Sequence, residues 1–108
     1  MLEFSIEDFF NQLSVHFDNI KCQDPYVPFW PELDLEIETS LETFFDSSFD
    51  ILIVTTGHRD YLDNDAIYKL IGQHNKEIII IDTVGLLDLH KLPKQFLQNK
   101  NFFLTNVQ

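Results

Sequence analysis

Two stretches of the chain are apolar at every position and then turn polar without a transition. The first is "ILIV" at residues 51–54, and the second is "IIII" at residues 78–81. Such runs are typical of strands buried on both faces, as in parallel sheets covered by helices. Between them, "DAIYKLIGQH" at residues 65–74 has apolar residues at helical spacing, with Asp63 or Asn64 as the candidate cap. The order strand, helix, strand predicts a parallel pair in an α/β sheet.

Weaker patterns predict the remaining elements. Ser5 is a candidate cap for a helix whose apolar face runs from Ile6 to Phe17. "LDLEIE" alternates apolar and acidic residues, which predicts a strand with one solvated face. The prolines of "DPYVPFWP" predict an extended loop, because proline donates no backbone hydrogen bond. Further elements are expected as a short strand at 19–24, a short helix opened by a capping box at 39–42, a helical turn at 94–97 and a last strand at 101–105.

Together these elements predict a single domain, residues 1–108, of the Rossmann-like α/β class, with a mostly parallel sheet in a three-layer arrangement. In such sheets, ligands bind outside the carboxyl ends of the strands. "TTGHRDY" and "DTVG" follow the two apolar strands, so we expect their loops to share one rim. That rim is the predicted ligand-binding edge.

The charge of the chain narrows the class of partner. Seven Lys and Arg against eighteen Asp and Glu give a net charge of −11. A field of this sign repels phosphate backbones, which argues against nucleic-acid binding. It suits a basic protein partner instead, as bound by a small immunity or regulatory protein. No apolar run approaches the ~20 residues of a membrane helix, and no signal-peptide pattern opens the chain, so a cytoplasmic protein without membrane contact is expected.

Four motifs, taken in order, resemble one enzyme family. "QDPYV", "TSLETFF", "DILIVTTGHRDY" and "EIIIIDTVGLLD" are similar to the C-terminal domain of the UDP-glucose/GDP-mannose dehydrogenases, over roughly residues 3–88. The resemblance implies a UDP-sugar-binding domain of an enzyme that uses NAD to oxidise C6 of a nucleotide sugar to a carboxylate, for polysaccharide precursors. In overall sequence character, the chain most resembles the branch of this family that acts on UDP-N-acetyl-mannosamine or UDP-N-acetyl-glucosamine.

The departures from that family set the limits of the expected function. The chain lacks the family's NAD-binding domain and nucleophilic cysteine, and Cys22 falls in the expected short strand, so it does not inherit that role. Val84 stands where the family often has Arg. The family's first, central strand is also missing. We therefore expect a chain that is inactive alone and binds no cofactor. Its sheet is completed either by "MLEF" and a rearranged neighbour, in an altered strand order, or by a second copy that pairs strands. The expected partners are a second copy of the chain (a homodimer) or the missing N-terminal enzyme domains.

The predicted rim supplies the candidate substrate-binding residues. His58 and Arg59 could contact a phosphate or a sugar hydroxyl; alternatively, His58 caps its loop and Arg59 pairs with Asp60 or Asp63 on the surface. For Asp82, contact with a ribose hydroxyl and a cap on the turn that follows are both open. The chain has no G-x-G-x-x-G motif, so its glycines are expected to serve turns. The full set of candidates is Thr56, Gly57, His58, Arg59, Asp82 and Thr83.

A second candidate surface is the aromatic group Tyr26, Phe29 and Trp30, which lies between prolines. Aromatic residues are enriched at interface cores, so we expect this group to dock a missing domain or close a dimer; stacking on a uracil is the alternative. No catalytic residue or metal ligand is assigned. The alternating acids of residues 34–38 are typical of a solvated strand face, and the histidines fall at no metal-ligand spacing.

Overall fold

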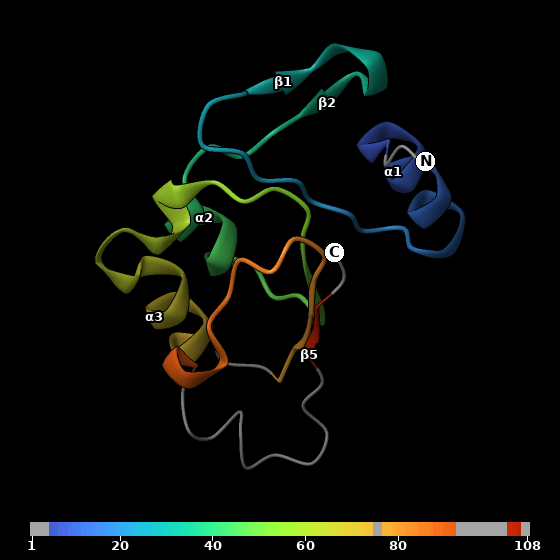
Figure 1. Ribbon diagram of the computed structural model, residues 1–108. Helices are drawn as coiled ribbons and strands as arrows, with labels where there is room; N and C mark the ends of the chain where they lie inside the picture. Colours follow the sequence, from blue (N-terminus) through green and yellow to red (C-terminus); the bar gives the residue numbers. More distant parts are fainter. Residues whose placement is uncertain (1–4, 75–76, 93–103, 107–108) are drawn as a thin grey trace. The chain divides into compact units, whose positions relative to one another are not determined.

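The computed structural model describes residues 5–74, 77–92 and 104–106. The chain forms two compact units, Met1–Phe44 and Phe45–Gln108 (Figure 1). Both helices and small sheets are present, including parallel strands, so the predicted α/β class is confirmed. The three-layer Rossmann-like arrangement and the single domain over residues 1–108 stay predictions.

The first unit begins with the predicted N-terminal helix. This helix, α1, spans Ile6–His16, and the Ser5 Oγ caps it by accepting a hydrogen bond from the Asp8 backbone N–H at 3.2 Å. The apolar face of α1 carries Phe10, whose ring lies edge-on to Trp30 with 5.9 Å between the ring centroids. The sequence pattern therefore located this helix and its first residue correctly.

A short hairpin replaces the loop and strand expected after α1. Strand β1, Phe29–Trp30, pairs antiparallel with β2, Leu35–Glu36, and a 3-10 turn, η1, fills Pro31–Leu33 between them. Proline fixes φ at a value suited to the first position of such a turn, and Asp34 follows in the left-handed region with φ 48°. The alternating pattern therefore yields a shorter strand than predicted. The strand expected at 19–24 is reduced to one isolated parallel bridge, Gln23 with Glu38.

Helix α2, Leu41–Asp46, begins in the first unit and ends in the second. Its cap is Ser40, whose Oγ accepts from the Thr43 N–H at 3.2 Å, one residue later than the predicted capping box. At its end, Phe45 is buried and packs edge-on against Phe49, with ring centroids 5.4 Å apart.

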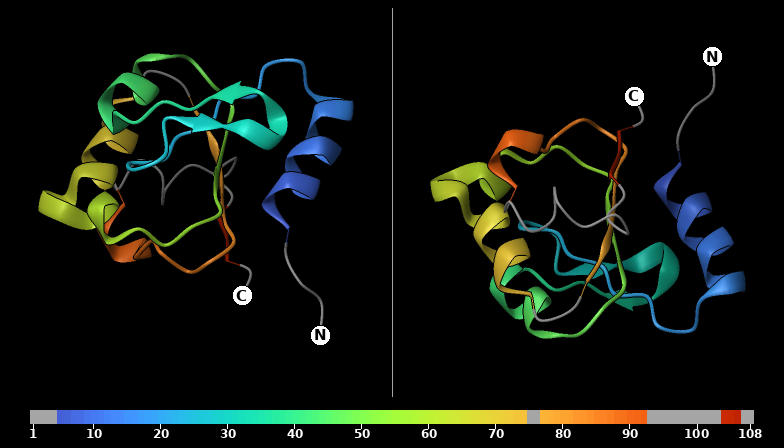
Figure 2. Two further views of the ribbon diagram at one scale, coloured as in Figure 1. Left: turned by 90° about the horizontal axis from the view of Figure 1, so that it is seen from above. Right: turned by 90° about the horizontal axis from the view of Figure 1, so that it is seen from below.

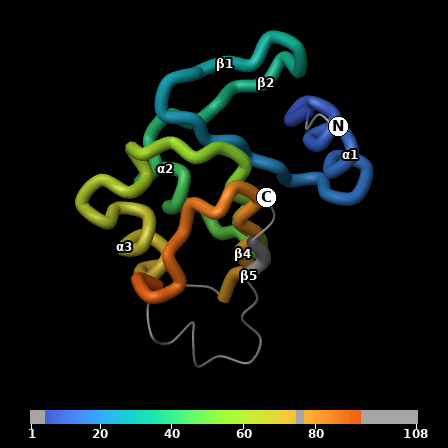
Figure 3. Tube along the Cα trace, in the orientation of Figure 1, coloured from blue at the N-terminus to red at the C-terminus, as the bar shows by residue number. Residues whose placement is uncertain are grey.

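The second unit contains a three-stranded sheet. Strands β3 (Ile51–Val54), β4 (Ile79–Asp82) and β5 (Leu104–Asn106) lie in the order β3-β4-β5, and both pairs are parallel. Ile80 of β4 lies opposite Leu104 of β5, and Asp82 lies opposite Asn106. Figure 3 traces the chain through β4. The predicted last strand is confirmed at Leu104 and Thr105; residues 101–103 and the helical turn expected at 94–97 lie outside the described residues.

Helix α3, Ala66–Gln73, is the helix predicted between the two apolar strands, and it lies to one side of the sheet in both views of Figure 2. It follows a 3-10 segment, η2, at Arg59–Asp65; a short turn, η3, covers Leu89–Lys91. The N-cap residue of α3 is Asp65, so the predicted cap at Asp63 or Asn64 is wrong. The Asp65 side chain makes no cap hydrogen bond. Asp63 and Asn64 both lie within η2, with non-helical backbone angles.

The apolar strands are buried on one face rather than on both. Leu52, Val54 and Ile80 are buried, together with the apolar side of α3. On the opposite face, the register partners Ile51 and Ile79 remain 36% and 40% exposed. The apolar runs identified strands correctly, but they do not by themselves bring a helix to each face.

Candidate functional site

The carboxyl ends of β3 and β4 meet at one rim, as the sequence predicted. Both the backbone N–H and the Oγ1 of Thr83 donate to the Val54 carbonyl, at 3.0 Å and 2.7 Å. A Cβ placed on Gly57 would lie 3.9 Å from the Val84 Cγ2. The loop after β3 and the loop after β4 therefore lie against each other.

Asp82 caps the loop that follows β4. Its side chain is 1% exposed; Oδ1 accepts from the Val84 N–H at 3.3 Å and Oδ2 accepts from the Leu87 N–H at 2.8 Å. Gly85, with φ 70°, adopts the left-handed conformation that this turn requires. Of the two roles left open for Asp82, the turn cap is the one seen here. The side chains of Asp82 and Thr83 thus stabilise the rim through hydrogen bonds to the backbone.

The loop after β3 presents the exposed side of the rim. Thr56, Gly57 and Arg59 are exposed, while His58 is half-buried with its ring edge-on to Tyr61 at 5.6 Å. The His58 side chain makes no cap hydrogen bond to η2, although the His58 carbonyl accepts from the Tyr61 N–H at 3.2 Å. The pairing of Arg59 with Asp60 or Asp63 stays a prediction.

Chemically, the rim combines a guanidinium, a hydroxyl and a glycine on one exposed edge. Arg59 offers paired donors that match phosphate or carboxylate oxygens, and Thr56 offers a further donor. The Cβ that Gly57 lacks would point toward Val84 of the neighbouring loop. This arrangement offers hydrogen-bond donors that suit an anion.

The rim does not fit a dinucleotide. A pyrophosphate cradle takes several close backbone approaches from one glycine-rich loop. Here the two rim glycines come from different loops, and Gly85 is committed to the turn capped by Asp82. The rim glycines therefore do not form such a cradle, and the absence of a bound cofactor stays a prediction.

The aromatic loop belongs to the first unit and is a separate surface. Asp24 Oδ1 accepts from the Tyr26 and Val27 N–H groups at 2.8 Å and 3.1 Å, which fixes the turn that presents Tyr26. Tyr26 is 64% exposed and Phe29 is 43% exposed. Trp30 is half-buried and packs against Phe10, so it links the hairpin to α1 in addition to forming part of the aromatic surface.

Cys22 has none of the features of an activated nucleophile. Its thiol is free and half-buried, and burial raises the pKa of the Cys22 thiol above its ordinary value. A reactive cysteine needs the opposite, a thiolate stabilised by a nearby positive group. This environment disfavours the Cys22 thiolate, and the expectation that Cys22 takes no catalytic role stays a prediction.

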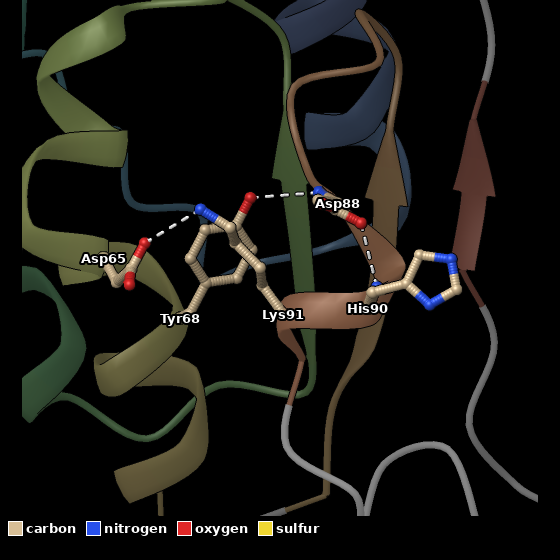
Figure 4. A network of polar contacts seen from close by, with 5 residues as sticks. All are labelled: Asp65, Tyr68, Asp88, His90 and Lys91. Carbon is tan, nitrogen blue, oxygen red and sulfur yellow. Dashed lines mark hydrogen bonds and ion pairs between the residues drawn. The ribbon is translucent and has the colours of Figure 1, made fainter.

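A second polar cluster was not predicted from the sequence (Figure 4). Lys91 Nζ lies 3.3 Å from Asp65 Oδ1 and 5.8 Å from the centre of the Tyr68 ring. The Tyr68 hydroxyl accepts from the Asp88 N–H at 3.0 Å, and Asp88 Oδ1 accepts from the His90 N–H at 2.9 Å. These contacts tie the chain after β4 to α3. No spacing rule pairs Asp65 with a lysine 26 positions later, and only the cap at Asp88 carries a local signal.

The cluster borders a shallow hollow lined by Asp65, Tyr68, Lys69 and Lys91. Its central ion pair is about half exposed on both sides, and exposed pairs of this kind contribute little to stability. In Figure 4, the His90 ring points away from the other side chains of the cluster. We interpret the cluster as a structural link rather than a ligand site.

Two kinds of feature, a metal-binding group and a membrane-spanning helix, are missing from the part of the chain that the structure describes. Within residues 5–74, 77–92 and 104–106, no group of His, Cys, Asp and Glu could hold a metal ion. No helix in the described ranges is long and apolar enough to span a membrane. Comparison with protein-family models, with curated proteins and with solved structures gave no match to this sequence.

Proposed function

We propose that this chain is a non-catalytic nucleotide-sugar-binding domain, of the kind found at the C-terminus of UDP-sugar 6-dehydrogenases. The ligand edge is the rim at the carboxyl ends of β3 and β4. The observation that carries the proposal is the junction of these two parallel strands through Thr83 and Val54. That junction leaves Thr56, Gly57 and Arg59 exposed on one edge, and such edges are where open α/β sheets bind ligands.

Each rim residue then has a distinct role toward the UDP-sugar. Arg59 pairs with the diphosphate, because guanidinium groups bind phosphate oxygens in a two-point geometry. Thr56 donates to a phosphate or ribose oxygen, and Gly57 lets the ligand approach the backbone. His58 lines the same loop beside Tyr61. Asp82 and Thr83 position this loop rather than touch the ligand, since their polar atoms already bind the backbone.

Catalysis belongs to a larger enzyme in this proposal. Oxidation of a UDP-hexose or UDP-N-acetyl-hexosamine to the uronic acid consumes NAD and uses a cysteine nucleophile in the family that the sequence resembles. The rim fits no dinucleotide, and the raised pKa of the Cys22 thiol disfavours the thiolate. The chain therefore supplies binding only and depends on other domains or subunits for turnover.

Calorimetric titration with UDP-N-acetylglucosamine tests the proposal, with NAD as the control ligand. We expect heat from the UDP-sugar and none from NAD. Arg59→Ala should lower the affinity by roughly tenfold or more, because a charge-assisted hydrogen bond contributes about 1.5–3 kcal/mol. Lys69→Ala is the matched control: it removes an exposed cation from the same unit, away from the rim.

Two outcomes would overturn the proposal. One is the absence of heat from the UDP-sugar in a sample that melts cooperatively. The other is an equal loss of affinity in Arg59→Ala and Lys69→Ala, which would assign the binding to general charge rather than to the rim.

A second candidate function rests on the aromatic loop. Tyr26 and Phe29 are exposed on a turn fixed by Asp24, in a chain with a net charge of −11. These features suit a regulatory or immunity-type module that binds a basic protein. A double variant, Tyr26→Ser with Phe29→Ser, should abolish capture of such a partner and leave UDP-sugar binding unchanged.

A further inference from the structure

Strand β3 lies at one edge of its sheet. The strand order β3-β4-β5 gives β4 a neighbour on each side and gives β3 a neighbour on one side, among the described residues. An unpaired strand edge presents rows of backbone donors and acceptors and is a template for another strand. Strand pairing at this edge is independent of nucleotide-sugar binding at the rim.

The hydrogen bonds to β4 identify the outward-facing groups. The carbonyls of Asp50 and Val54 accept from Ile79 and Thr83, so the even-numbered residues of this stretch face β4. Because backbone direction alternates along a strand, the N–H and C=O groups of Ile51, Ile53 and Thr55 face the opposite edge. Among the described residues of the second unit, none hydrogen-bonds to these outward groups.

This edge carries none of the usual protection. Edge strands commonly carry lysine, proline or a bulge, each of which hinders pairing with a second chain. Residues 51–55 are Ile, Leu, Ile, Val and Thr, without a charge or a proline. Four of the five are β-branched, a side-chain type that suits paired strands.

We propose that β3 pairs with β3 of a second copy of this chain, antiparallel and about a two-fold axis, so that the two sheets become continuous. With Ile53 opposite Ile53 of the second copy, and Ile51 opposite Thr55, every outward backbone group of the three residues finds a partner. A strand that pairs with itself in this way forms a closed, self-complementary dimer. We choose a second copy as the partner because the edge of β3 is self-complementary: β3 supplies all the donors and acceptors that the pairing needs.

Charge distinguishes this occupant from a basic protein. Two copies, each with a net charge of −11, repel each other outside the uncharged edge. Added salt screens that repulsion, so the dimer should strengthen as salt rises. A complex with a basic partner would weaken under the same change.

Sedimentation velocity of the whole chain over a concentration series tests the pairing, with a thermal melt as the check on folding. We expect the unmodified chain to dimerise and Ile53→Pro to remain a monomer. The Ile53 N–H faces away from β4, so proline at this position blocks the second copy and removes no hydrogen bond to β4. Ile53→Val keeps the N–H and the branched side chain and should still dimerise.

A second pair of variants decides the matter if the proline variant fails to fold. Ile53 and Ile81 are register partners on the same sheet face and are both half-buried, but Ile53 is on the edge strand and Ile81 on the central one. Ile53→Lys places like charges opposite each other across the proposed axis and should weaken the dimer several-fold. Ile81→Lys should leave the dimer intact.

Four results would overturn the pairing: an unmodified chain that stays monomeric at every concentration, a folded Ile53→Pro variant that still dimerises, equal dissociation of both lysine variants, or a dimer that weakens with salt. Equal dissociation would assign the contact to the sheet face rather than to its edge. A titration of the same samples with the UDP-sugar measures ligand affinity at the rim separately from dimerisation.

Discussion

The two units of the chain are stabilised in different ways. Every buried apolar side chain in the described part of the chain lies in Phe45–Gln108, and residues 5–44 contain none. The first unit relies instead on local contacts: the Ser5 cap, the Asp24 turn, the short hairpin and the packing of Phe10 on Trp30. Since buried apolar area is the main source of stability, we infer that the second unit is the rigid part that supports the rim.

The same contrast recurs within the rim. The loop after β4 is held by Asp82 and Thr83, whose polar atoms all bind the backbone. The loop after β3 exposes Thr56, Gly57 and Arg59. The loop after β4 is therefore held by backbone hydrogen bonds, and the loop after β3 is the one that we propose contacts the ligand.

The largest effect should come from the core of the second unit. Ile80 is 0% exposed and sits in the central strand, and Ile80→Ala should lower the free energy of unfolding by about 2–5 kcal/mol because it leaves a cavity. Its neighbour Ile79 points to the opposite, exposed face, so Ile79→Ala should cost clearly less. Urea unfolding of both variants makes the comparison, and equal losses would contradict the one-sided core.

A smaller loss is expected at the cap after β4. Asp82→Asn replaces a buried carboxylate that accepts two backbone hydrogen bonds, and it should lower the free energy of unfolding by about 1.5–3 kcal/mol. Asp88→Asn is the control, since Asp88 caps the exposed η3 turn and asparagine caps nearly as well as aspartate. Urea midpoints that shift equally in both variants would remove the special role of Asp82.

In the first unit, Ser5→Ala should act locally. Loss of an N-cap costs a helix roughly 1 kcal/mol, so amide exchange in α1 should become several-fold faster. Exchange at β3 and β4 should stay unchanged, because the core of the second unit is untouched. Uniformly faster exchange across the chain would mean that both units unfold as one.

The smallest effect concerns the Cys22 thiol. Burial raises the pKa of this thiol in the folded chain, so alkylation by iodoacetamide near pH 8 should be slower in the folded protein than in urea. The stability linked to this shift is present below the unfolded pKa and is lost as pH rises through the folded pKa. Alkylation that is equally fast in both states would show a thiol without this protection.

Local patterns in the sequence predicted the elements that depend on local chemistry. The Ser5 cap, the helical spacing in α1 and α3 and the apolar runs of β3 and β4 were all found where expected. The shared rim followed from the parallel order of the strands. The residues that determine each of these elements lie close together in the sequence.

Three other features were not predicted from the sequence pattern. The hairpin at Phe29–Glu36 forms across prolines that indicated a loop, because the strands pair on either side of η1. Pairing of Asp65 with Lys91 joins positions that are brought together only by the fold. The role of Asp82 was left open because the backbone groups that it accepts from are placed by the turn itself.

Residue-level mapping of UDP-N-acetylglucosamine binding by ¹H–¹⁵N NMR tests the central claim most directly. The account predicts that the backbone amides of Thr56, Gly57, Arg59 and Val84 shift on titration while those of α1 stay in place. No shifts at saturating ligand, or shifts confined to Tyr26–Trp30, would contradict a ligand edge at the ends of β3 and β4.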